Sequence, residues 1–120
     1  MWRLNPETNR LLCLKVWPSQ GDRSEFERSC YEIQFEKGIG LPGRVWKHRK
    51  PAWIPDVTKD DNFPRAAQAA AEDLHAAFAF PILSGEKLLG VMEFFSPEIR
   101  EFDDAMFSTF TGIGSQIGQF

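Results

Sequence analysis

Three spaced glycines in the segment Gly38-Ile39-Gly40-Leu41-Pro42-Gly43 match the GxGxxG pattern of dinucleotide-binding loops. That chemistry needs a buried strand before the glycines and a long helix after them, so that the helix N-terminus meets the pyrophosphate. Here the preceding residues, YEIQFEK, are half polar, and Pro51 leaves room for only two helical turns. We therefore interpret the glycines as a sharp turn before a short helix.

No other spacing predicts a catalytic or metal centre. Cys13 and Cys30 are isolated, without a CxxC pair or an adjacent base, and His48 and His75 lack the HExxH pattern. The aspartates of the 56–61 loop lack EF-hand spacing and a closing Glu, which favours a solvated turn. We expect no catalytic residue, no metal and no enzyme activity of this domain by itself.

Glu93 stands within the apolar run VMEFF, where burial is expected. A buried carboxylate must be paired or hydrogen-bonded, because leaving it alone costs several kcal/mol. Candidate partners are the guanidinium groups of Arg44 and Arg65 and the indole N–H groups of Trp46 and Trp53. We favour an internal strut that ties a covering loop to the sheet, and the alternative is a ligand contact.

His75 directly precedes the first strand of the apolar hairpin described below. At the end of an Ala-rich helix it would compensate the negative pole of that helix. The alternative is a polar group at the mouth of a pocket, and we favour the helix-end interpretation.

The elements that position these residues follow from periodicity and turn chemistry. Asn62 suits an N-cap, with Pro64 tolerated in the first turn of a helix rich in Ala. We expect a hairpin of strands over 2–4 and 11–17, a helical turn over 26–30, a strand over 31–35, a short helix over 44–50, a strand over 52–54 and the Ala-rich helix over 65–74.

Residues 76–83 and 87–95 are apolar on both faces and are joined by Ser84-Gly85-Glu86. They predict a buried antiparallel hairpin in the middle of the sheet. Phe78 and Phe80 share one face of the first strand by alternation. The predicted fold class is α+β, an antiparallel sheet with helices on both faces.

A C-terminal helix is expected from Asp103 onward. Apolar residues in it are spaced 4, 3, 4, 3, which is the seam of a two-helix contact and predicts a homodimer. The seam consists of Met106, Phe110, Ile113, Ile117 and Phe120.

Length, composition and net charge restrict the kinds of partner that we expect. The 120 residues suffice for one core, and eleven Phe and four Trp against one Tyr indicate a core built around rings. A net charge of −3 with interleaved signs predicts neither nucleic-acid nor membrane binding. No segment reads as a signal peptide or a membrane span, so we expect a cytoplasmic location with reduced thiols.

The chain resembles the GAF domain family, in particular the bacterial type that accompanies sensor histidine kinases and diguanylate cyclases. The matching stretches are GIGLPGRVWKHRKPAWIPDV (38–57), NFPRA (62–66), AFAFPI (77–82), LGVMEFFS (89–96) and IGSQIGQF (113–120). The resemblance implies a PAS-like central antiparallel sheet of five to six strands. It also implies terminal helices on one face and a small-molecule pocket on the other. We expect one GAF domain over 1–120 that lacks the family's N-terminal helix and ends within its C-terminal helix.

The position of residues in the family, together with the residues singled out above, gives candidates for the ligand pocket. They are Arg44, Trp46, Trp53, Phe63, Arg65, His75, Phe78, Phe80 and Glu93.

Bilin-binding members of the family carry a cysteine in or near the helix before the central strand. Residues 66–75 contain none, so no covalent bilin is expected and the cofactor is unknown.

Three functions remain open for such a domain. The first is a sensory domain in which a small molecule shifts the arrangement of the terminal helices. The second is a ligand-free dimerisation and relay module whose pocket is filled by its own rings. The third, a GAF-type methionine sulfoxide reductase, requires reactive cysteines in the pocket loops and is ranked last, because Cys13 and Cys30 lie in other segments.

Overall fold

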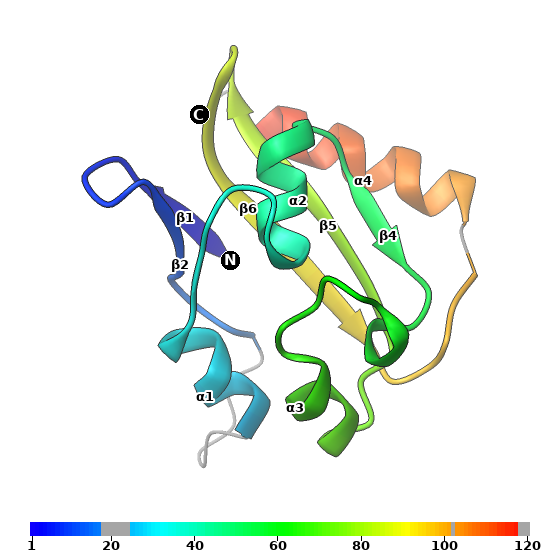
Figure 1. Ribbon diagram of the computed structural model, residues 1–120. Helices are drawn as coiled ribbons and strands as arrows, with labels where there is room; N and C mark the ends of the chain where they lie inside the picture. The colour runs from blue at the N-terminus through cyan, green and yellow to red at the C-terminus, as the bar shows by residue number, and fades with distance from the viewer. Residues whose placement is uncertain (18–24, 102, 118–120) are drawn as a thin grey trace.

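A computed structural model describes residues 1–17, 25–101 and 103–117 as a six-stranded antiparallel sheet with helices on both faces (Figure 1). This confirms the predicted α+β class. The elements are β1 (Trp2–Asn5), β2 (Arg10–Cys13), α1 (Glu25–Glu32), β3 (Gln34–Phe35), α2 (Gly40–His48), β4 (Ala52–Ile54), the 3-10 helix η1 (Val57–Lys59), α3 (Ala66–Ala71), β5 (Ala76–Ser84), β6 (Lys87–Ser96) and α4 (Asp104–Ile117).

The strands follow the order β3-β2-β1-β6-β5-β4. β5 and β6 form the predicted central hairpin, with Ala79 opposite Glu93 and Phe78 opposite Phe94. On the other side of β6, the short strand β1 pairs only at Val91 and Gly90. β6 therefore continues beyond the end of β1, and within the described part of the chain its residues 92–96 have no strand beside them on that side.

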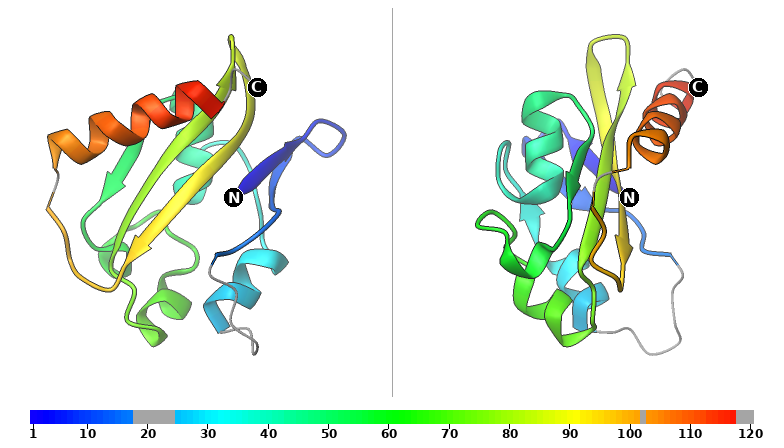
Figure 2. Two further views of the ribbon diagram at one scale, coloured as in Figure 1. Left: turned by 180° about the vertical axis from the view of Figure 1, so that it is seen from behind. Right: turned by 90° about the vertical axis from the view of Figure 1, so that its right-hand side faces the viewer.

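Alternation along β5 divides the molecule into two layers. Ala77 and Ala79 belong to the core beneath α1, α2 and α3, whereas Phe78 contacts Phe107 of α4 with ring centroids 5.5 Å apart. Seen edge-on, the sheet separates α4 from the other helices (Figure 2). We call the side of α1 to α3 the cover side and the opposite side the α4 side.

Several elements differ from the sequence expectation because tertiary contacts end them early. β2 stops at Cys13, and the amide of Val16 instead donates to the hydroxyl of Tyr31 on α1, 3.1 Å away. The Ala-rich helix spans Ala66–Ala71 and so ends before the predicted Leu74. The prediction of Asn62 as its N-cap is wrong, because the side chain of Asn62 bonds to the glycine loop and Arg65 holds the N-cap position. Within the described ranges, no helix is long and apolar enough to cross a bilayer.

The glycine motif is explained by close packing at the start of α2. A Cβ on Gly40, whose φ is +69°, would lie 2.3 Å from the ring of Phe35. A Cβ on Gly43 would lie 2.4 Å from the carbonyl oxygen of Glu36. The amide of Gly38 donates to the carbonyl of Gly43 at 2.8 Å, which closes the turn. The turn predicted before the helix is therefore present at Gly38, but the helix begins earlier than expected, so that Gly40 and Gly43 lie within α2 and serve its packing.

Gly43→Ala is expected to lower the free energy of unfolding by about 1–3 kcal/mol, the range for a methyl group forced into a packed site. Gly112→Ala is the matched control, since its Cβ meets no atom within 4 Å and Ala is favoured in a helix by up to about 1 kcal/mol. Urea unfolding of both variants measures the difference. An equal or greater stability of the Gly43 variant would contradict the packing explanation.

Candidate functional site

Glu93 of β6 and Arg65 before α3 form a buried ion pair. Arg65 Nη2 lies 2.7 Å from Glu93 Oε2 and Nη1 lies 3.0 Å from Oε1, with side chains 1% and 3% exposed. The indole Nε1 of Trp2 donates a further hydrogen bond to Glu93 Oε1, 2.7 Å long. A bidentate guanidinium with an added donor satisfies a buried carboxylate. The predicted strut is confirmed with Arg65, and its indole donor is Trp2 rather than Trp46 or Trp53.

Aromatic rings from several strands, a helix and the loop before α3 surround the guanidinium of Arg65. Its Cζ lies over five rings, with centroid distances from 4.8 to 5.6 Å, and Nη1 also contacts the Sγ of Cys30 at 3.4 Å. Ring faces attract cations, and the attraction is stronger where water is excluded. We call Glu93, Cys30 and the five rings the Arg65 cage, the rings being those of Trp2, Phe26, Phe35, Phe63 and Phe95.

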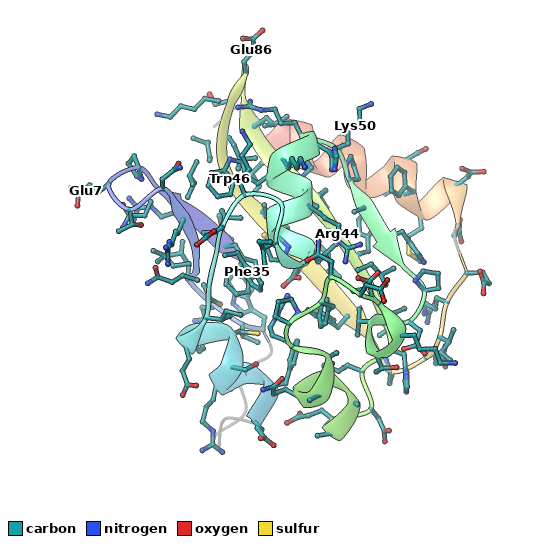
Figure 3. All side chains as sticks on the ribbon, viewed as in Figure 1. Glu7, Phe35, Arg44, Trp46, Lys50 and Glu86 are labelled. Carbon is teal, nitrogen blue, oxygen red and sulfur yellow. The ribbon has the colours of Figure 1, made fainter. Side chains whose placement is uncertain are left out.

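A hydrogen-bonded loop places Arg65 over the sheet. Arg44 of α2 forms a bidentate ion pair with Asp60, and its Nη2 also donates to the carbonyl of Asn62 at 2.8 Å. The side chain of Asn62 accepts from the amide of Gly40 and donates to the carbonyl of Gly38. Figure 3 shows Arg44 on the part of α2 that faces this loop, with Lys50 beyond the opposite end of the helix. Arg44 therefore anchors the covering loop and does not contact Glu93.

The charges of the cage set the protonation of its neighbours. Burial is the largest single influence and opposes the charge of Arg65, but the charge and hydrogen bonds of Glu93 together with the contact of Cys30 hold the pKa of Arg65 above its ordinary value. Burial raises the pKa of the Cys30 thiol, and it raises the pKa of Cys13 to about 11. Both thiols are thus protonated, weak nucleophiles at neutral pH.

A pocket of about 390 Å³ opens beside the cage, where β6 runs past the end of β1. We call it the edge pocket. It combines carboxylates, thiols and aromatic rings, and several of these groups also hold Arg65. Its lining residues are Met1, Trp2, Cys13, Lys15, Val16, Trp17, Phe26, Glu27, Cys30, Glu72, Leu74, Met92, Glu93, Phe94 and Phe95.

Trp53, Phe78 and Phe80 lie on the α4 side of the sheet. The ring of Phe78 lies 5.6 Å from that of Trp53 and 6.0 Å from that of Phe80. A second pocket, of about 300 Å³, lies there between the sheet and the start of α4. The prediction that one pocket combines these three residues with Arg65 and Glu93 is wrong, because the sheet stands between the two groups.

Trp46, Phe63 and His75 lie on or beside the cover side. Trp46 and Phe63 are buried in the core, and neither lines the edge pocket. The Nδ1 of His75 lies 3.2 Å from the carboxylate of Asp56, and its ring does not end the Ala-rich helix. Asp56 also accepts from the hydroxyl and amide of Thr58, and these hydrogen bonds, with that of His75, lower the pKa of Asp56. His75 therefore stabilises the turn before η1.

The C-terminal helix confirms its predicted start, with Asp103 accepting from the amide of Met106 at 3.1 Å as an N-cap. Met106 lines the pocket on the α4 side against its own sheet rather than an outward seam. The side chains of Phe110, Ile113 and Ile117 and the whole of Phe120 lie outside the described residues. The predicted dimer seam thus stays a prediction.

Three of the five rings of the cage have no sequence signal that marks them as neighbours of Arg65. Trp2, Phe26 and Phe35 lie on three separate elements, and an aromatic residue at an apolar position predicts ordinary core as readily. Phe95 does have a signal, because it lies two residues from Glu93 and so on the same face of one strand. In the part of the chain that the structure describes, no three His, Cys, Asp or Glu side chains group to hold a metal ion.

The family model described as GAF domain matches residues 1–120. Among curated proteins, the truncated basic helix-loop-helix protein A of Pisum sativum is 29% identical over 92 residues, which is 74% of this chain and 25% of that protein. Protein NLP1 of Arabidopsis thaliana is 33% identical over 84 residues, 68% of this chain and 9% of that protein. The chain thus spans a quarter or less of these relatives.

Solved structures share the fold at low sequence identity. The GAF domain of a phosphoenolpyruvate-protein phosphotransferase from Coxiella burnetii has a TM-score of 0.78 and 14% identity, with 98% of this chain and 66% of that chain covered. The free methionine-R-sulfoxide reductase of Neisseria meningitidis, in complex with its substrate, has a TM-score of 0.75 and 14% identity, with 98% of this chain and 62% of that chain covered. A domain of a Sinorhizobium meliloti protein described as a two-component sensor histidine kinase has a TM-score of 0.71 and 14% identity, with 98% of this chain and 72% of that chain covered.

Glu93→Gln is expected to lower the free energy of unfolding by about 3–5 kcal/mol, since it leaves the buried guanidinium of Arg65 uncompensated. Glu98→Gln is the control, because its pair with Arg100 is exposed and such pairs contribute at most about 1 kcal/mol. Urea unfolding at pH 7 compares the two variants. If both lost the same small amount, the strut interpretation would be refuted.

Proposed function

This chain belongs to the GAF domain family, and we propose that it is a ligand-binding regulatory module of a larger signal-transduction protein. The observation that carries the proposal is the edge pocket, whose volume of about 390 Å³ suits a metabolite-sized compound. Its rings offer apolar area, and its carboxylates offer orientation, which is the usual composition of small-molecule sites.

The edge pocket is connected to the scaffold through the Arg65 cage. Trp2 and Glu93 line the pocket and also bind Arg65, which begins the covering segment of α3. A ligand that contacts these groups changes the relative stability of two arrangements of cover and sheet, which is how binding shifts a population. α4 packs on β5 on the opposite face of the same sheet, and we propose that it relays the change. In this proposal two copies of the chain form a homodimer through their terminal helices.

The nature of the parent protein is the finer part of the proposal. The sequence resemblance favours a sensor histidine kinase or a diguanylate cyclase as the parent protein. The Sinorhizobium structure agrees with a kinase parent in its fold alone, because its sequence identity is 14%. The two curated relatives described above, at 29% and 33% identity, are instead a plant basic helix-loop-helix protein and a plant NLP protein. We therefore propose a regulatory role that is common to these parents and separate from the chemistry of any output domain.

We also propose that the domain itself is not an enzyme, although its fold is shared with a methionine sulfoxide reductase. Redox catalysis needs a thiolate, and burial works against it here. With its pKa at about 11, Cys13 is roughly 0.1% thiolate at pH 8, against about a quarter for an ordinary thiol.

Alkylation by iodoacetamide at pH 8 tests this point. From these thiolate fractions, the folded protein is expected to react roughly 250-fold more slowly at Cys13 than the urea-unfolded chain, as mass spectrometry of the modified peptide would show. Equal rates in the two states would contradict the proposal that the thiol is inert.

A second function has its own observation in favour of it. The interior beneath α2 and α3 is occupied by the guanidinium of Arg65 and by rings, with Trp46 and Phe63 4% exposed each. A domain whose interior is filled in this way also suits a ligand-free dimerisation and relay module. The two functions differ in whether the edge pocket binds a compound.

Native mass spectrometry and an absorption spectrum of freshly purified protein, followed by thermal-shift screening of metabolites, test the ligand-binding function. A co-purifying mass or a stabilising compound is expected, and Val16→Trp, which fills the edge pocket, is expected to weaken its binding at least about tenfold. Leu12→Trp on β2 is the matched control outside that pocket. A clean apo spectrum without any stabilising compound would favour the relay module instead.

A further inference from the structure

The Arg65 cage has the composition of a binding site for an organic cation. Two oxygens of one carboxylate face two nitrogens of the guanidinium at 3.0 and 2.7 Å, the planar match that guanidinium makes with carboxylate. Five rings enclose the same group at 4.8–5.6 Å, an arrangement by which proteins bind guanidinium and alkylated ammonium ions. The site is formed, and the chain's own side chain fills it.

The hydrogen bonds of the Arg65 side chain all belong to the two terminal nitrogens of its guanidinium. Nη1 and Nη2 bind Glu93, and Nη1 also contacts Cys30, whereas Nε has no hydrogen-bond partner among the described residues. A free guanidinium ion with one small substituent therefore reproduces each polar contact without the stem or backbone of Arg65. The stem contributes a tether, which raises the local concentration of the group at the cage.

An entry path for a free cation is also present. Five members of the cage, namely Trp2, Phe26, Cys30, Glu93 and Phe95, also line the edge pocket. Loss of the Arg65 side chain would vacate the cage next to this pocket and so connect the vacated site with solvent.

We propose that the cage is a guanidinium-binding site whose built-in occupant is Arg65, and that the vacated cage binds small guanidinium compounds. The inference rests on the cage and not on whether the edge pocket binds a metabolite. In the intact protein the tethered group outcompetes a free one, so binding is confined to the state in which Arg65 has left.

The test uses Arg65→Ala and methylguanidinium chloride at concentrations well below those that denature proteins, compared with NaCl at equal ionic strength. At about ten times the dissociation constant, the melting temperature of the variant is expected to rise by roughly 5 °C more than in NaCl. The wild-type protein is expected to show no such difference, because its cage is occupied.

Arg44→Ala is the matched control, since Arg44 also makes a bidentate ion pair, with Asp60, but no ring of the cage encloses it. Methylguanidinium is expected to give no specific stabilisation to Arg44→Ala. The double variant Arg65→Ala with Glu93→Gln is expected to lose the effect. A rise of equal size in the wild type, in Arg44→Ala or in the double variant would overturn the proposal.

The experiment remains decisive if Arg65→Ala does not fold alone. Methylguanidinium present during refolding is then expected to restore the near-ultraviolet circular dichroism of the variant. It is also expected to shift the indole ¹⁵N–¹H resonance of Trp2, which donates to Glu93. Arg65→Met, which keeps the apolar stem, provides a second background for the same measurements. Absence of restored structure and of thermal stabilisation in both variants would refute the site.

Discussion

The buried ion pair between Arg65 and Glu93 is the interaction on which the rest of the domain depends. Neither charge is stable alone in an interior of aromatic rings, so the two must meet there. Their meeting requires the covering loop before α3 to lie across the middle of β6. The clamp of Arg44, Asp60 and Asn62 on the start of α2 secures that loop. The cover and the sheet are thus joined at a charged centre.

Filling the interior with this pair and its rings decides where a ligand has room. The space beneath α2 and α3 is occupied, and two pockets lie instead at the end of β1 and between the sheet and α4. The edge pocket nevertheless reaches the charged centre, since Glu93 and Trp2 belong to both. A compound bound at the edge is therefore adjacent to the contact that holds the cover, which makes regulation by binding a physically direct proposal.

The solved structures that share this fold include a reductase, a phosphotransferase domain and a kinase domain, each at 14% identity. At that level the common feature is the scaffold, and function follows from the side chains at each site. In this chain the thiols are protonated by burial and the interior carries a matched ion pair.

The local features could be predicted from the amino-acid sequence: the central hairpin, the turn at the glycine motif, the family, and the need of Glu93 for an ionic or hydrogen-bonding partner. These follow from alternation, turn residues and the cost of a lone buried charge, all of which act within a short stretch of chain. Tertiary packing was needed to show that the partner is Arg65 and not Arg44, that the indole belongs to Trp2, and that Phe78 and Phe80 lie on the α4 side of the sheet. The reason is distance along the chain. Trp2 and Glu93 are 91 residues apart, Arg65 and Glu93 are 28 apart, and which of several equivalent side chains meet depends on how the segments between them pack.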